Sequence, residues 1–133
     1  MVNLRNPAHS LVKLMNPCKG RALIVSSYTH PEYAVSMAQT FQLTQANAFL
    51  IRGTEGEPVA DARRTPQMDF FHNGLTQTVQ AAQTGALQSL PDLPNASAEA
   101  TAIYIQEVLQ HKREVPAPIA LQVQHILQAL KSL

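Results

Sequence analysis

The residues best suited to chemistry in this chain of 133 residues gather at positions 52–57, with the sequence Arg-Gly-Thr-Glu-Gly-Glu. Glycines let a backbone approach a ligand closely, and carboxylates supply the oxygen ligands that magnesium prefers. The segment lacks both the Gly-Lys-Ser/Thr ending of a P-loop and the glycine spacing of a dinucleotide-binding fingerprint. An acidic loop whose glutamates pair with Arg63 and Arg64 explains these residues equally well. The candidate ligand loop comprises Gly53, Glu55, Gly56 and Glu57.

Basic side chains dominate the opening of the chain, where Arg5, Lys13, Lys19 and Arg21 precede the first acidic residue, Glu32. The formal net charge is only +1, so the overall charge does not indicate a polyanionic partner. A local basic patch is nevertheless typical of proteins that contact phosphates. The alternative is a solvated surface beside a subunit contact.

A short predicted helix carries a second candidate pair, because His9 and Lys13 are four residues apart and therefore lie on one side of it. The pair could bind a phosphate, while a histidine at a helix end beside a surface lysine is the structural alternative. Ser10 is adjacent to His9 and faces elsewhere, which disfavours a nucleophilic Ser-His pair. None of the five histidines form a close pair of zinc ligands, and the single cysteine, Cys18, excludes an internal disulfide.

Alternating helices and strands must position these residues. Asn6-Pro7 is typical of a helix start, and Asn16-Pro17 of a helix end. An unbroken apolar strand is predicted at residues 22–26, a helix beginning at Thr29 or His30, and a second buried strand at residues 46–51. This order, with short connections, predicts a right-handed parallel crossover.

A loop, a third strand and two closing helices are predicted for the rest of the chain. Residues 53–66 form a loop at the carboxyl end of a strand, where α/β proteins place their ligands, and residues 75–79 are compatible with a strand. We expect both closing helices to dock through apolar faces. The faces comprise Ala98, Ala102, Ile105 and Leu109 in the first helix, and Ile119, Val123, Ile126, Leu127 and Leu130 in the second.

The predicted fold class is therefore α/β, a partial parallel sheet with flanking helices in one domain. So few strands leave exposed edges, which is more typical of part of a larger sheet. Only 14% of the residues are charged, and a weakly charged surface often adjoins a partner. The longest apolar run, residues 22–25, is too short to span a membrane, and no apolar signal segment follows Met1, so we expect a cytoplasmic protein.

Several strings in the chain resemble a known family. Residues 5–14, 27–33 and 52–65 are similar to the YbiB-type DNA-binding branch of glycosyltransferase family 3, whose enzymes are anthranilate phosphoribosyltransferases. The spacing of Arg5 to Asn16-Pro17, and a strand ending in Arg-Gly, also resemble the enzymes. The likeness extends over nearly the whole chain, including the two closing helices.

The resemblance implies that residues 1–133 are a C-terminal portion of the nucleoside phosphorylase/phosphoribosyltransferase-like α/β domain of a larger two-domain protein, usually a homodimer. The family's N-terminal helical domain and its Gly-Thr-Gly-Gly-Asp loop, which binds phosphoribosyl pyrophosphate, are absent from this sequence. The enzymes' metal-binding Asp-Glu pair would fall at Pro58-Val59, which have no carboxylate. Phosphoribosyl transfer relies on that metal, so the resemblance implies a binding protein rather than an enzyme.

We therefore expect sequence-independent binding of nucleic acid, in particular DNA, through phosphate contacts, with no catalytic residue, cofactor or membrane partner. One alternative is the C-terminal part of an anthranilate phosphoribosyltransferase of tryptophan biosynthesis, which would use magnesium. Another is a nonfunctional truncation product that starts at Met1. The phosphate contacts are assigned to Arg5, His9, Lys13, Lys19, Arg21 and Arg52.

Overall fold

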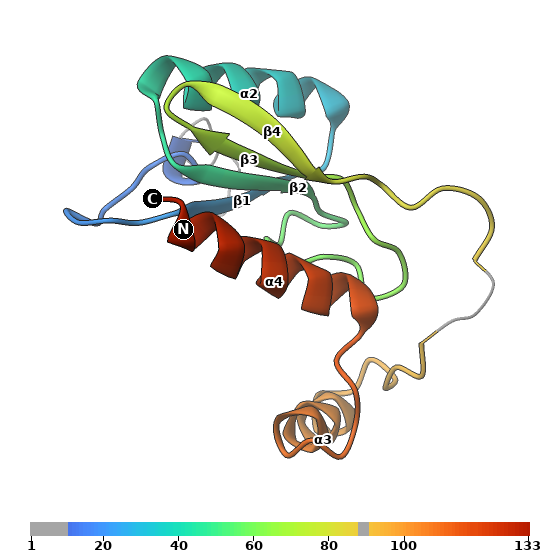
Figure 1. Ribbon diagram of the computed structural model, residues 1–133. Coiled ribbons are helices and arrows are strands. Elements are labelled where there is room, and N and C mark those ends of the chain that lie inside the picture. The colour runs from blue at the N-terminus through green and yellow to red at the C-terminus, as the bar shows by residue number, and fades with distance from the viewer. Residues whose placement is uncertain (1–10, 88–90) are drawn as a thin grey trace, which may run out of the picture.

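The computed structural model describes residues 11–87 and 91–133, and shows an α/β arrangement of one mixed sheet and three helices (Figure 1). Arg5, His9 and the part of the predicted opening helix before Leu11 lie outside the described residues. Among the described helices, none is long and apolar enough to cross a membrane. In chain order the elements are β1 (Ile24–Tyr28), α2 (Pro31–Thr44), β2 (Ala48–Arg52), β3 (Met68–His72), β4 (Leu75–Gln80), α3 (Ala98–Leu109) and α4 (Ala117–Lys131).

The sheet has the strand order β1-β2-β3-β4 and is mixed. β1 and β2 are parallel, with Ile24 opposite Ala48, so the predicted parallel crossover through α2 is confirmed. β3 runs antiparallel to β2, and β4 antiparallel to β3, which corrects the prediction of a parallel sheet. A two-residue turn with positive φ at Asn73 and Gly74 joins β3 to β4, which permits an antiparallel neighbour without a crossover.

Strand β3 was absent from the sequence prediction, whereas β1 and β2 lie within two residues of their predicted positions and β4 was anticipated at residues 75–79. The sequence of β3, Met-Asp-Phe-Phe-His, lacks the regular alternation of apolar and polar residues that marks a half-buried strand. Met68 and Phe70 pack on one face of the sheet and Phe71 on the other. Burial on both faces therefore hides the pattern.

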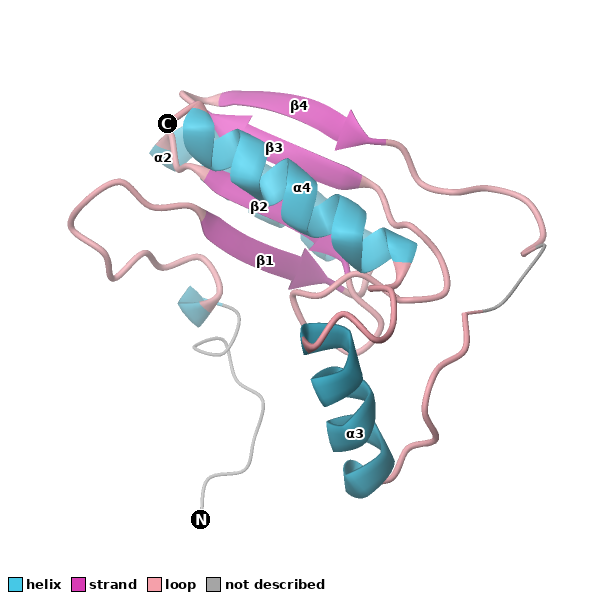
Figure 2. Cartoon of the chain, turned by 60° about the horizontal axis from the view of Figure 1, so that its bottom comes forward, coloured by secondary structure: helices cyan, strands magenta, loops and turns pink. Residues whose placement is uncertain are grey.

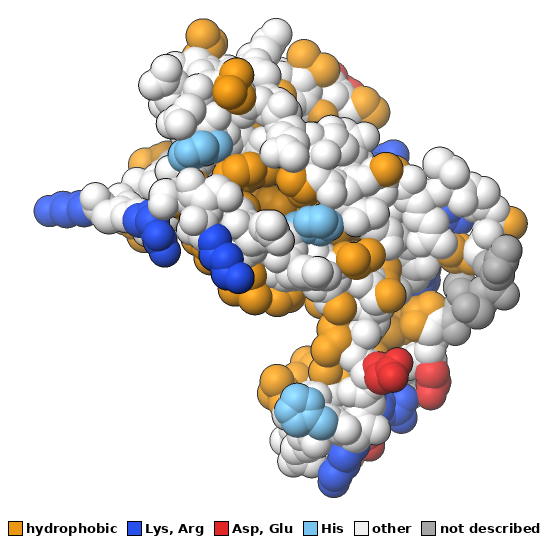
Figure 3. Space-filling view, in the orientation of Figure 1, with side chains coloured by type: hydrophobic (Ala, Val, Ile, Leu, Met, Phe, Trp, Pro, Cys, Tyr) orange, Lys and Arg blue, Asp and Glu red, His pale blue; other side chains and the backbone are white. Residues whose placement is uncertain are grey.

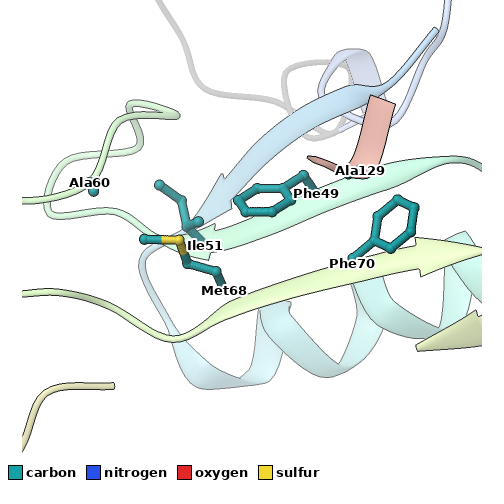
Figure 4. Close-up of a cluster of buried hydrophobic side chains, with 6 residues drawn as sticks. All are labelled: Phe49, Ile51, Ala60, Met68, Phe70 and Ala129. Carbon is teal, nitrogen blue, oxygen red and sulfur yellow. The ribbon is translucent and has the colours of Figure 1, made fainter. Parts of the chain in front are cut away.

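Two helices cover opposite faces of the sheet (Figure 2). On one face, Met37 and Phe41 of α2 pack on β2 and β3, with the rings of Phe41 and Phe71 5.2 Å apart. On the other face, Phe49 and neighbouring side chains point toward α4 (Figure 4). β2 is consequently buried on both sides, which explains its unbroken apolar sequence.

Helix α4 docks on the sheet as predicted, with Ile126 against the core and Ile119 and Leu130 partly buried, but part of the predicted face is wrong. Val123 and Leu127 are 50% and 55% exposed, whereas Gln122 is buried. The Gln122 amide accepts a hydrogen bond from the Ala60 backbone N–H at 2.8 Å and donates one to the Pro58 carbonyl at 3.0 Å. These bonds to the loop after β2 orient α4 with a polar residue inward, so an apolar pattern alone cannot identify its face.

Helix α3 begins at Ala98, with the Ser97 side chain accepting from the Ala100 N–H, and it has no buried residue. The expectation that it docks through Ala98, Ala102, Ile105 and Leu109 is therefore wrong, because the helix projects away from the sheet (Figure 1). Its contacts are local: Arg113 pairs with Glu107 and Asp92 and lies over the Tyr104 ring.

Candidate nucleic-acid interface

The candidate ligand loop after β2 is a closed turn. The Glu57 carboxylate accepts hydrogen bonds from the Thr54 N–H at 2.9 Å, the Thr54 hydroxyl at 2.7 Å and the Glu55 N–H at 2.8 Å. The bond from the Thr54 side chain, followed by backbone bonds, lowers the pKa of Glu57 to about 2. Both oxygens of this carboxylate therefore already hold the turn together.

The two glycines of this loop serve its own packing. A Cβ on Gly53 would lie 2.8 Å from the Glu57 carbonyl oxygen, and Gly56 has a φ of +99°. The Ser27 hydroxyl donates to the Gly56 carbonyl at 2.8 Å, and the Lys13 ammonium lies 3.4 Å from the same oxygen. The glycines are thus explained by contact with β1, without a ligand.

The predicted pairing of Glu55 and Glu57 with the two arginines is wrong. Arg63 pairs with Asp61 at 3.1 Å, and this bond lowers the pKa of the Asp61 carboxyl. Arg64 donates instead to the backbone carbonyls of residues 83 and 85. No group of three His, Cys, Asp or Glu residues suited to a metal ion occurs within residues 11–87 and 91–133.

Arg52 ends β2 directly opposite Tyr28, at the same end of the sheet as the loop. Burial raises the pKa of Tyr28, the nearby Asp69 raises it further, and Arg52 lowers it. Asp69 accepts hydrogen bonds from Thr78 and Gln67. Arg52 therefore lies among groups of both charges rather than in a basic patch.

The opposite end of the sheet gathers cations from distant parts of the chain. Lys19 and Arg21 precede β1, and the Arg21 guanidinium donates to the Leu133 carbonyl at 3.4 Å. Lys131, in the last turn of α4, is therefore brought to the same end. We call Lys19, Arg21 and Lys131 the cationic end; all three are exposed, and blue side chains gather near the C-terminus in Figure 3.

No Asp or Glu side chain accompanies these cations among the described residues. The segments that meet here are the start of β1, the end of α2, the β3–β4 turn and the end of α4, and none of them contains an acidic residue. The acidic residues next to the sheet, Glu32, Glu55, Glu57, Asp61 and Asp69, lie at the opposite end. The other four, Asp92, Glu99, Glu107 and Glu114, lie in or beside α3.

The structure thus divides the predicted phosphate contacts. Lys19 and Arg21 lie together, while Lys13 and Arg52 lie at the other end of β1, roughly 16 Å away for a five-residue strand. Lys131 was missed by sequence reasoning. The absence of acidic residues after Glu114 was a usable signal, but only the fold shows that this helix ends beside the basic opening segment.

Comparison with known proteins identifies one distant relative and no matching protein-family model. Over 124 residues the chain is 33% identical to YbiB of Escherichia coli (strain K12), which is described as an uncharacterized protein. The match includes 92% of this chain and 38% of YbiB, so the chain spans well under half of that relative. The chain is therefore a distant homologue of part of YbiB.

Proposed function

We propose that this protein binds nucleic acid without sequence preference, through phosphate contacts made by the cationic end. The observation that supports it is the separation of charge: three exposed cations from two distant segments lie together, and every acidic side chain lies elsewhere. A net charge of +1 conceals this polarity. Such a local field attracts polyanions over about 8 to 10 Å at physiological ionic strength.

The side chains of the cationic end suit phosphate. None of its three members forms a salt bridge to a described Asp or Glu side chain, and Arg21 already donates to a main-chain oxygen of Leu133, so the two lysines have the more available charges. Arg21 offers a planar fork that can bind two phosphate oxygens, and lysines act as flexible point charges. Phe70 and Phe71, which come from the strand ending here, are buried and cannot stack on bases, which favours phosphate contact over base readout.

Lys13 and Arg52 extend the proposed surface. Roughly five nucleotides of one strand would span the about 16 Å along β1 that separates Lys13 and Arg52 from the cationic end. The acidic loop beside Lys13 makes that end the weaker contact. Arg5 and His9 complete the proposed set, and their positions lie outside the described residues.

We also propose that the chain corresponds to the C-terminal α/β portion of a YbiB-type protein of glycosyltransferase family 3, with a homodimeric full-length form. The match to 38% of YbiB supports only that the chain corresponds to part of such a protein. The competing proposal, a phosphoribosyltransferase, receives no support from the loop, since the carboxylate of Glu57 closes the turn and Pro58-Val59 have none to offer.

The test is fluorescence anisotropy of the full chain with a labelled random-sequence DNA duplex, titrated at several salt concentrations. We expect affinity to fall as salt rises, and Lys131→Gln to reduce the slope of log affinity against log salt by about 0.9 for one lost phosphate contact. Lys112→Gln, which removes the same charge beside α3, is the matched control and should leave the slope unchanged. A slope of zero, or equal losses in both variants, would overturn the proposal.

A further inference from the structure

The turn between β3 and β4 contains the one Asn-Gly pair in the sequence. Of the six asparagines, only Asn73 precedes a glycine, while the others precede Leu, Pro or Ala. Asn73 is exposed, and φ is +53° at Asn73 and +76° at Gly74. Two positive φ values in a two-residue hairpin turn are typical of type I′, for which Asn-Gly is a preferred pair. The same pair also supplies two groups that can react with each other.

We propose that Asn73 is a site of spontaneous deamidation, which places a carboxylate at the cationic end. The backbone nitrogen of Gly74 loses its proton to hydroxide and attacks Cγ of Asn73, an intramolecular step. The new C–N bond closes a five-membered succinimide ring. The bond between Cγ and Nδ2 breaks, and this nitrogen takes a proton from water and leaves as ammonia. Water then opens the ring at either carbonyl, giving aspartate or isoaspartate with one new negative charge.

The Asn73 side chain leaves the carbon that must be attacked accessible. Its Nδ2 lies 3.2 Å from Nε2 of His72, and Nδ1 of His72 lies 2.6 Å from Oδ1 of Asn47. Because an amide oxygen only accepts, Nδ1 of a neutral His72 carries the proton, and Nε2 accepts from Asn73. No residue in the described part of the chain donates a hydrogen bond to the Asn73 side-chain oxygen. The amide is therefore held only through the nitrogen that departs.

A flip of one peptide plane brings the two reacting groups together. Type I′ and type II′ turns differ in the orientation of their central peptide, here the one between Asn73 and Gly74. Type II′ requires negative φ at the second central residue, which a glycine adopts as readily as positive φ. The flip moves the Gly74 nitrogen from the side opposite the Asn73 Cβ to the same side, within reach of Cγ. Both turn types fit the twist of a hairpin, so β3 and β4 stay paired.

Asn95 provides an internal control in the same molecule. It is exposed in a loop, as Asn73 is in its turn, but Ala96 follows it, and the alanine Cβ crowds the attacking nitrogen. Its Oδ1 also accepts a hydrogen bond from the Ser97 N–H at 3.0 Å, which holds the side chain. Deamidation should therefore be slower at Asn95 than at Asn73.

The new carboxylate would change the charge of the cationic end. The β3–β4 turn lies at the end of the sheet where β1 begins and α4 ends (Figure 2), and the described segments that meet there contain no acidic residue. A negative charge at the same end as Lys19, Arg21 and Lys131 opposes phosphate binding. Deamidated protein should therefore bind nucleic acid more weakly. This consequence rests on the proposed function, whereas the modification itself does not.

Mass spectrometry of the full chain, incubated folded at mildly alkaline pH and physiological temperature, tests the site. We expect residue 73 to gain the mass difference between an amide and a carboxylic acid, and peptide mapping to separate aspartate from isoaspartate. Asn73→Gly is the matched variant, since Gly-Gly also forms type I′ turns and no amide remains. Circular dichroism verifies that the chain stays folded. No gain at residue 73, or a gain no faster than at Asn95, would overturn the proposal.

Fluorescence anisotropy with a DNA duplex tests the effect of the charge. Asn73→Asp keeps a type I′ pair and carries the carboxylate permanently, so its affinity at low salt should fall about two- to fivefold, as for one exposed ion pair. Asn73→Gly should bind as the wild type does, before and after incubation. Salt-dependent binding that is equal in Asn73→Asp and the wild type would overturn the charge effect. A wild type that does not bind DNA contradicts the proposed function instead, and the mass measurement still decides the modification.

Discussion

Gln122 of α4 accepts a hydrogen bond from the backbone N–H of Ala60 at 2.8 Å, joining residues 62 positions apart in a buried contact. The same amide donates to the Pro58 carbonyl. Through these bonds the loop after β2 sets the rotation of α4 about its axis. Because Lys131 lies about two and a half turns further along this helix, the contact also contributes to where the cationic end forms.

Gln122→Leu should therefore destabilise the fold. The replacement has a similar size but leaves the Ala60 N–H buried without an acceptor, which costs about 1 to 3 kcal/mol. The free energy of unfolding measured by urea titration gives the difference. Gln124→Leu is the control, since Gln124 is an exposed glutamine of the same helix, and its effect should stay within about 0.5 kcal/mol. Equal effects would show that Gln122 does not orient α4.

Gly53→Ala should also destabilise the protein, because the added Cβ would lie 2.8 Å from the Glu57 carbonyl oxygen and 3.3 Å from the Ser27 Cβ. Backbone atoms cannot move aside cheaply, so we expect a loss of about 1 to 3 kcal/mol. Gly20→Ala is the matched control, since its Cβ would meet nothing within 4 Å. Urea unfolding of the two variants compares them directly, and a neutral Gly53→Ala would mean that the loop yields easily.

Much of the α/β order could be predicted from the sequence because it depends on local rules. The apolar spacing and Pro31 identify α2, and the unbroken apolar run identifies β2. β3 was missed because its polar residue Asp69 is stabilised by partners on β4 and the preceding loop, as in the bond from Thr78. Such partners become visible only once the strands are paired.

The candidate site was predictable only in part, for a related reason. The basic opening segment was evident from the order of charges, but Lys131 belongs to the site because Arg21 reaches the carbonyl of Leu133, which is 112 positions away. The interpretation of residues 53–57 as a ligand loop required the carboxylates of Glu55 and Glu57 to face outward toward a ligand. Glu57 instead turns back to its own backbone, a local competition that residue types alone do not reveal.

Glu57 should make the free energy of unfolding depend on pH in the acidic range. Its pKa falls from 4.5 to about 2 on folding, so its contribution is complete above pH 4.5 and is lost as the pH falls toward 2. Glu57→Gln should be less stable than the wild type at pH 7. One of the two accepting oxygens would be replaced by an NH2 group, whose hydrogens would face the N–H or O–H donors of the turn. This difference should shrink as the pH falls from 4.5 to 2, as measured by denaturant unfolding at each pH.

Glu55→Gln is the control for that experiment, because its backbone N–H rather than its carboxylate enters the turn. Its stability should follow the wild-type curve over the same pH range. A Glu57→Gln curve that stays parallel to the wild type would show that the carboxylate is not the acceptor that closes the turn.

Magnesium with phosphoribosyl pyrophosphate should leave the thermal unfolding midpoint of this chain unchanged. A ligand present at 100 times its Kd stabilises a protein by about 2.7 kcal/mol, which a thermal scan detects readily. We expect no such shift, because the Glu57 carboxylate already accepts three hydrogen bonds and the adjacent Pro58-Val59 supply no carboxylate. A random-sequence DNA duplex at low salt is the positive control and should raise the midpoint. A shift with magnesium and phosphoribosyl pyrophosphate together, lost in Glu57→Gln, would instead favour the phosphoribosyltransferase.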